Sequence, residues 1–106
     1  MKSDGSTLHL DGDLTIYQAG ERWEELRQVL QECVAQSSGQ QPQLTMDTHD
    51  LVDVDSAGLQ LLVQFSQRAR DADIAVNWQT PGAALTNMIS LYNAWQWFAE
   101  PAEATS

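Results

Sequence analysis

Residues 50–63 restrict the fold more than any other part of the chain, because a polar turn there runs directly into an apolar helical pattern. The turn ends in Asp55-Ser56-Ala57-Gly58, which places one hydroxyl and two small residues at the expected start of a helix. The first backbone N–H groups of a helix have no partner within it, and the helix dipole is positive at that end, so anions are favoured there. We therefore expect the main functional site at this junction.

Apolar residues spaced three and four apart predict three helices. The first covers residues 21–35, and the second begins near Ser56. The third is expected to have Thr80 as N-cap and Pro81 at the first helical position, where the missing proline N–H is no loss. The second helix has an expected buried stripe and an expected outer face: Leu59, Leu62, Val63, Ser66 and Ala69 inward, and Gln60, Gln64, Gln67 and Arg68 outward.

Alternating apolar and polar residues predict the strands. The expected strands are residues 7–10, 14–17, 43–47 and 74–78, with a turn at 11–13 between the first two. Strands and helices then alternate, which is typical of an α/β domain with at least partly parallel pairing. The 106 residues suffice for one domain, with its core within residues 6–98 and flexible ends at 1–5 and 99–106.

The chain is strongly acidic, since fifteen Asp and Glu against five Lys and Arg give a net charge of −10. Such a surface repels nucleic acid and anionic lipid head groups, and it suits a basic patch on a protein partner. The chain has neither an apolar run near the roughly 20 residues of a membrane span nor a signal-peptide pattern, so we expect a cytoplasmic protein without membrane insertion. The single Cys33 excludes an internal disulfide and a cysteine-based zinc cluster.

Ser56 has two interpretations. Its hydroxyl, or the carboxylate of Asp55, can accept a hydrogen bond from the first helical turn and act as a structural N-cap. Alternatively, Ser56 is a contact hydroxyl or a phosphoacceptor, and a phosphate there would gain from the helix dipole but be repelled by Asp55 and Asp53. Such a phosphate would switch the charge of an interface.

Neither a metal site nor a catalytic site is expected. Four aspartates do not follow the spacing of a calcium loop: Asp47, Asp50, Asp53 and Asp55. His9 and His49 have no obvious third ligand, and the glycines form no nucleotide-binding motif, so no cofactor is expected. A small hydrolase or phosphocarrier that uses Ser56 with His49 stays open as an alternative, which the distance between the two side chains decides.

An aromatic cluster near the end of the chain, Trp95, Trp97 and Phe98, is denser than a terminal segment requires. Its rings either close the core or, where exposed, anchor a binding partner. The burial of each ring distinguishes these two roles.

The segment Asp47–Val63, and within it Val54-Asp55-Ser56-Ala57-Gly58-Leu59, resembles the signature of STAS domains, the family of anti-sigma factor antagonists. The likeness covers nearly the whole chain, since Leu10–Leu14, Arg68–Trp78 and Thr80–Leu91 are similar to further elements of the family. It implies a single STAS-like α/β domain with a four- to five-stranded mixed sheet flanked by helices. It also implies a non-enzymatic regulator that binds a protein, often a serine kinase or anti-sigma factor.

In the antagonists the third motif position is a serine whose phosphorylation releases the partner, whereas this chain has Ala57 there, so Ser56 is the nearest candidate phosphoacceptor. The alanine motif resembles chemotaxis-associated STAS proteins and the STAS subunit that binds the ATPase of a phospholipid-transport ABC complex. In that transport branch the residue matching Ser56 contacts the ATPase. Asp55 is expected to cap the helix and Gly58 to admit the partner's backbone. The expected partner-binding surface is Asp55, Ser56, Ala57, Gly58, Gln60 and Gln64.

Overall fold

A computed structural model describes residues 2–4, 7–36, 39 and 41–98 of the chain. Eight elements follow one another along these residues: β1 (Lys2–Asp4), β2 (Thr7–Leu14), α1 (Ala19–Ala35), β3 (Gln43–Val54), α2 (Ser56–Asp71), β4 (Ala75–Trp78), α3 (Ala83–Leu91) and the 3-10 helix η1 (Trp95–Trp97). The alternation of strands and helices expected from the sequence is confirmed.

The strands form one mixed sheet in the order β1-β2-β3-β4. β1 pairs antiparallel with β2, whereas β2–β3 and β3–β4 are parallel pairs. Each parallel pair is joined through a helix, because parallel neighbours need a crossover connection. The predicted α/β fold with a mixed sheet is therefore confirmed, and the sheet has four strands in the described part of the chain.

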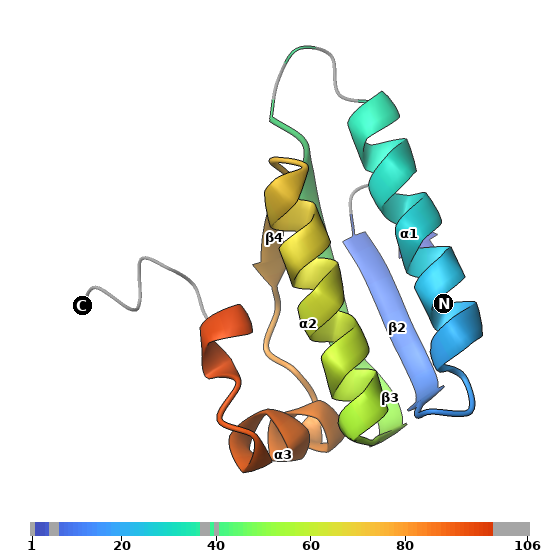
Figure 1. The fold of residues 1–106 in the computed structure, drawn as a ribbon, viewed down its shortest axis with the longest axis vertical. Coiled ribbons are helices and arrows are strands. Elements are labelled where there is room, and N and C mark those ends of the chain that lie inside the picture. The colour runs from blue at the N-terminus through green and yellow to red at the C-terminus, as the bar shows by residue number, and fades with distance from the viewer. Residues whose placement is uncertain (1, 5–6, 37–38, 40, 99–106) are drawn as a thin grey trace.

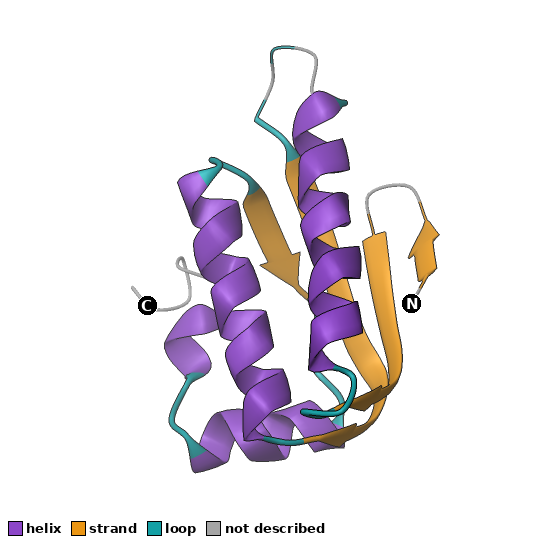
Figure 2. Cartoon of the chain, turned by 45° about the vertical axis from the view of Figure 1, so that its right-hand side comes forward, coloured by secondary structure: helices purple, strands orange, loops and turns teal. Residues whose placement is uncertain are grey.

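The two long helices lie side by side over one face of the sheet, and α3 lies at the end of the sheet where β3 finishes (Figures 1 and 2). Apolar residues of α1, α2, β2 and β3 meet between these layers. On α2 the predicted inward residues are buried except Val63, which is half-buried, and Leu61 and Phe65 widen the buried face. The four residues predicted to face outward on α2 are all exposed.

The turn predicted at residues 11–13 is wrong, because β2 continues through it to Leu14. The parallel pairing with β3 continues through this segment, with register shifts between His9 and Asp11 and between Gly12 and Asp13. Gly12 takes a φ of +72°, which a glycine adopts without steric cost. Arg22 of α1 donates a hydrogen bond to the carbonyl oxygen of Asp11 at 2.6 Å and so ties the irregular strand to the helix. The strand predicted at residues 14–17 is accordingly a turn after Leu14.

Three further boundaries differ from the sequence prediction. β3 runs on from residue 47 to Val54, since it keeps pairing with the extended β2. The N-cap of α3 is Gly82, not Thr80, and Pro81 lies before the helix. Lys2–Asp4, predicted as part of a flexible end, form β1. Residues 1, 5 and 99–106 of the predicted flexible ends lie outside the described residues.

Among the described helices, none combines the length and the apolar character needed to cross a membrane.

Gly58, in the first turn of α2, packs directly against the end of β2. A Cβ atom on Gly58 would lie 2.0 Å from the carbonyl oxygen of Leu14 and 2.9 Å from its carbon. No real Cβ atom tolerates such distances to rigid backbone atoms. A residue without a side chain is therefore required where α2 crosses the end of β2.

We predict that Gly58→Ala lowers the free energy of unfolding by about 3 kcal/mol or more, since α2 must move away from β2. Gly20→Ala is the matched control, because a Cβ on this helical glycine meets nothing within 4 Å. The free energy of unfolding of Gly20→Ala should be unchanged or should rise by up to about 1 kcal/mol, because alanine favours the helix more than glycine does. Chemical denaturation of both variants measures the difference, and equal stability of the two would contradict the steric argument.

Candidate functional site

The turn before α2 is organised by the carboxylate of Asp55. Its Oδ1 accepts a hydrogen bond from the backbone N–H of Gly58 at 3.0 Å, and its Oδ2 accepts one from the backbone N–H of Ile16 at 3.0 Å. The first bond is an N-cap of α2, and the second holds the loop between β2 and α1. Asp55 therefore joins two segments that are far apart in the sequence.

These two bonds also set the ionisation of Asp55. The N–H of Ile16, followed by the N–H of Gly58, holds the pKa of this carboxyl below its usual value. Hydrogen bonds to the charged form favour ionisation. Asp55 is thus a fixed negative charge at the positive end of the α2 dipole.

Ser56 is freed from the capping role because Asp55 performs it. Ser56 is the first residue of α2 and is exposed, while Ala57 beside it is half-buried. Gln60 and Gln64 are exposed further along the helix. Ser56, Gln60 and Gln64 are therefore exposed on the first half of α2, with Ala57 half-buried beside them.

The role predicted for Gly58 is wrong. This glycine is buried and faces the carbonyl group of Leu14, so it admits the backbone of β2 and not that of a partner. The sequence correctly marks a position that needs a glycine, but the neighbour that imposes the need belongs to the chain itself.

Two shallow grooves flank this half of α2. One, of about 260 Å³, separates α1 from α2 and is lined by Ala19, Gly20, Trp23, Ala57, Gln60, Leu61 and Gln64. The other, of about 420 Å³, lies between α2 and the end of the described chain and is lined by Ser56, Leu59, Gln60, Val63, Tyr92, Ala94 and Trp97. Gln60 borders both, so the outer side of α2 forms a ridge between two depressions.

The aromatic cluster at the end of the chain divides between the two roles considered for it. Phe98 is buried and packs against Trp78, with 4.6 Å between the ring centroids. Trp97 is half-buried and lines the groove beside Ser56, while Trp95 is 40% exposed. Phe98 thus closes the core, and the two tryptophans remain at the surface.

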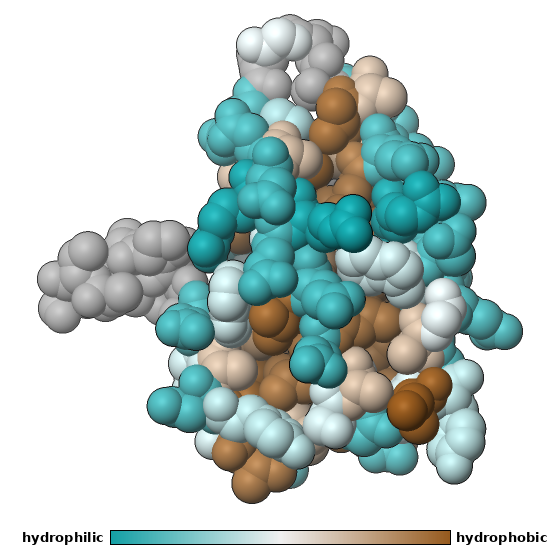
Figure 3. Space-filling model, in the orientation of Figure 1, coloured by the Kyte–Doolittle hydropathy of each residue, from teal (hydrophilic) through white to brown (hydrophobic). Residues whose placement is uncertain are grey.

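Exposed apolar side chains surround the start of α2, and sequence reasoning missed them. Ile16 and Tyr17 follow β2 and are 65% and 90% exposed, and Tyr92 on the other side is 54% exposed. Figure 3 shows apolar surface gathered at this lower end of the helical face, below a largely hydrophilic upper part. Ile16 and Tyr17 fit a strand pattern and Tyr92 a helix core position, so only their exposure in the fold identifies them.

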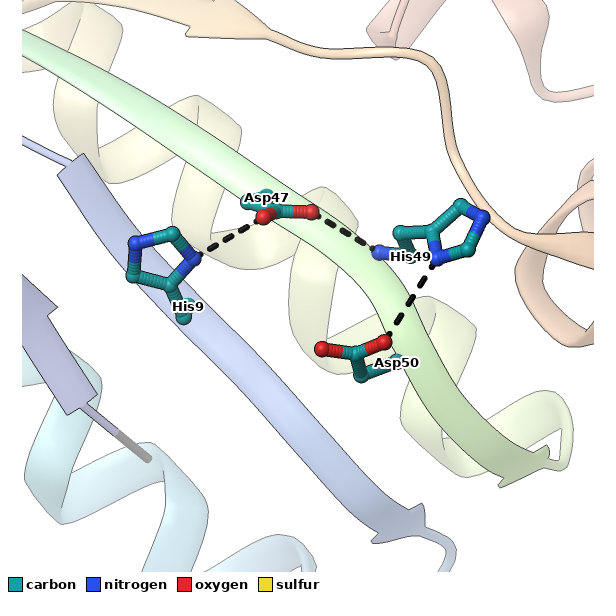
Figure 4. A network of polar contacts seen from close by, with 4 residues as sticks. All are labelled: His9, Asp47, His49 and Asp50. Carbon is teal, nitrogen blue, oxygen red and sulfur yellow. Dashed lines mark hydrogen bonds and ion pairs between the residues drawn. The ribbon is translucent and has the colours of Figure 1, made fainter.

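The histidines and several of the aspartates lie on the sheet and away from this surface. His9 Nδ1 and Asp47 Oδ2 are 2.8 Å apart across β2 and β3, and the backbone N–H of His49 donates to Asp47 Oδ1 at 3.1 Å (Figure 4). The His49 N–H, and then the His9 ring, hold the pKa of Asp47 below its usual value. Among the described residues, no group of three acidic, histidine or cysteine side chains is arranged to hold a metal ion.

The Ser56–His49 alternative does not fit the path of the chain. His49 lies within β3, five residues before its end at Val54. A strand rises by about 3.3 Å per residue, so the backbone of His49 lies roughly 16 Å from the end of β3, too far for its ring to come within the about 3 Å that separates a serine hydroxyl from its histidine base. His49 instead lies 3.5 Å from Asp50, measured from Nδ1 to Oδ1.

We predict that Asp55→Asn lowers the midpoint of thermal unfolding at pH 7, because an amide offers one oxygen to two N–H donors. The folded-state pKa of Asp55 is lowered, so the ionised carboxylate stabilises the fold above the unfolded-state pKa of about 3.9. That contribution is lost as the pH falls through the lower folded-state pKa. The difference between the wild type and Asp55→Asn should therefore shrink in acid.

Asp53→Asn is the control for this change, because it removes the same charge from an exposed residue that faces Asp13 across β2 and β3. Relief of like-charge repulsion makes this variant neutral or slightly stabilised. Equal destabilisation of both variants at pH 7 would refute the role of Asp55 as a cap.

Comparison with known proteins adds the family to this geometry. Residues 1–96 match the sequence model of the family described as "Mlab, STAS domain". No curated protein has a matching sequence.

Two solved structures share the fold. One is a candidate anti-sigma factor antagonist from Thermotoga maritima, with a TM-score of 0.62 and 16% identity over 98% of this chain and 88% of the other. The second, Mglu, has a TM-score of 0.55 and 18% identity over 74% of this chain, which spans only 18% of the Mglu chain. At these identities the likeness concerns the fold alone. The family match over residues 1–96, together with a fold like that of an anti-sigma factor antagonist, shows that the chain belongs to the STAS-domain family.

Proposed function

We propose that this protein is a non-enzymatic regulator that binds a protein partner through the start of α2. The observation that carries the proposal is the exposed Ser56, held at the N-terminus of α2 by Asp55 and bordered by exposed apolar side chains on both sides. Aromatic and apolar residues around a polar centre are typical of protein interfaces. The contact surface consists of Ser56, Ala57, Gln60, Gln64, Ile16, Tyr17 and Tyr92.

The charge of the chain indicates the chemistry of the partner. With a net charge of −10, the protein attracts a basic surface and repels an acidic one over about one Debye length. Asp53 and Glu21 are exposed near the two ends of the site, just before α2 and in the first turn of α1. We therefore infer a partner surface rich in Lys and Arg, with pockets for aromatic side chains.

Two kinds of partner fit this surface. One is a serine kinase or anti-sigma factor, as the resemblance to the antagonists implies, with Ser56 as the phosphoacceptor. The other is the ATPase of a phospholipid-transport ABC complex, on which the protein would dock without phosphorylation. Ala57 favours the second kind, since it removes the hydroxyl from the position that antagonists phosphorylate. A chemotaxis-associated regulator would use the same surface.

Capture of the tagged, full-length protein from its native cell, with intact-mass measurement of the recovered chain, separates these partners. A kinase or anti-sigma factor together with a phosphate on Ser56 supports the phosphoswitch. An ABC-type ATPase together with unmodified Ser56 supports constitutive docking.

We predict that Ser56→Asp weakens binding of the captured partner by at least about tenfold, because a carboxylate at the centre of the contact would be desolvated away from the basic groups that face Asp53 and Glu21 at its ends. An acidic residue in the first helical turn interacts favourably with the dipole, so the fold itself should keep its stability. Gln67→Glu is the control, since it adds the same charge to an exposed position about 16 Å further along α2. Titration calorimetry measures both, and equal affinities would remove Ser56 from the interface.

We also predict that Tyr17→Ser and Tyr92→Ser each lower the affinity for the partner by about tenfold or more while leaving the unfolding midpoint nearly unchanged. Both rings are largely exposed, so their loss costs contact area in the complex rather than core packing. Val34→Ser serves as control, because Val34 is 46% exposed near the far end of α1. If Val34→Ser weakens binding as much as the tyrosine variants do, the exposed apolar side chains around the start of α2 do not form the specific contact with the partner.

A further inference from the structure

A groove with a volume of about 730 Å³ surrounds β4, the strand at one edge of the sheet. Neither Ser56 nor Gln60 lines it, so a ligand in this groove would lie outside the contact surface of the proposed function. The groove is bounded by α2, by all four residues of β4 and by η1. The lining residues that matter most are Ser66, Arg70, Asp73, Trp78 and Trp97.

The backbone of β4 offers hydrogen-bonding groups along this groove. Ala75 and Gln79 donate their N–H groups toward the β3 side at 2.9 Å each. In a parallel pair the residues between such positions direct their N–H and C=O groups away from that neighbour. Val76 and Trp78 therefore present their backbone groups at the outer edge of β4, where the described sheet ends.

Ser66 of α2 supplies a second feature that indicates a ligand. The residue is only 8% exposed, and its hydroxyl has no hydrogen-bond partner within the described part of the protein. A buried hydroxyl without a partner is costly, and a ligand group that bonds to it recovers that cost. Ser66 lines the groove, so a ligand that fills the groove would pack against this residue.

Arg70 lies one helical turn beyond Ser66 and gives the groove a positive group. Its guanidinium lies 5.1 Å from the centroid of the Trp97 ring. A stacked guanidinium keeps its N–H donors at its edge, where they can bind a carboxylate in bidentate fashion. Asp73 also lines the groove, where its carboxylate accepts a hydrogen bond from the Gln41 amide at 3.4 Å. In a chain with five cationic residues, Arg70 is thus placed to select an acidic group.

We propose that this groove binds an extended peptide, which adds a strand to the edge of β4 and places an acidic side chain against Arg70. Strand addition satisfies the outward backbone groups of Val76 and Trp78, and a polar group of the peptide satisfies the Ser66 hydroxyl. A peptide fits the site better than a compact molecule, because the backbone donors and acceptors repeat along a strand.

Selection of random linear peptides displayed on phage against the immobilised full-length protein tests this proposal. The expected peptides have Asp or Glu among residues that favour strands. The strongest of them, made synthetically, is the probe. Its binding should perturb the backbone N–H resonances of Val76 and Trp78.

Arg70→Gln should lower the affinity for the probe peptide by about tenfold or more, whereas Arg68→Gln should leave that affinity unchanged. Arg68 is a close control, because it is exposed on the same helix and also lies over a tryptophan, with 5.6 Å to the Trp23 ring. Ser66→Ala should lower the affinity for the probe peptide severalfold. It should not lower the stability of the fold, since the hydroxyl bonds to no described group in the free protein.

Val76→Pro should also weaken binding of the probe, because it removes one outward N–H donor of β4. The variant should still fold, since proline is tolerated in an edge strand where its nitrogen faces away from the sheet. Peptides without acidic residues, equal affinity for the Arg70 and Arg68 variants, or a library that yields no binder would each overturn the proposal. Resonance changes confined to the Ser56 surface would overturn it as well, as they would place the peptide elsewhere.

Discussion

The double hydrogen bond to the carboxylate of Asp55 is the interaction on which the rest of this structure depends. It joins the start of α2 to the loop after β2, through the N–H groups of Gly58 and Ile16. The contact of Gly58 with the Leu14 carbonyl group presses the same two elements together. Because Asp55 and Gly58 perform these structural roles, Ser56 between them is left exposed at the helix end.

The sequence predicts the fold wherever local signals and tertiary packing agree. The start of α2 is such a place, since an aspartate cap, a glycine and an apolar repeat all indicate it. The Asp11-Gly12-Asp13 segment shows the opposite case. Its residues favour a turn, but the segment instead pairs with β3 as part of a parallel ladder. Likewise, Thr80 and Pro81 form a good local start signal, but the helix begins after Gly82, whose Cβ position would lie 2.3 Å from the His49 carbonyl oxygen. Such contacts come from distant residues and leave no local mark.

The same limit applies to the site. The outward half of α2 follows from helical periodicity, so Gln60 and Gln64 could be placed on the surface beside Ser56 before the fold was known. Ile16, Tyr17 and Tyr92 could not, because an apolar residue in a short segment is expected in the core and only the fold reveals that it is exposed. Gly58 carries the converse lesson, since a position that demands glycine does not reveal which backbone approaches it.

Trp97 connects the two surfaces of the protein. Its ring lines the groove beside Ser56 and also the groove along β4, where it stacks with Arg70. A ligand that moves this ring in one groove changes the shape of the other, so occupancy of the two grooves need not be independent. Any such coupling must be reciprocal, because the factor by which one ligand alters the affinity of the second equals the reverse factor. A partner at Ser56 and a peptide at β4 would then favour or exclude each other through one side chain, with α2 as the rigid element between them.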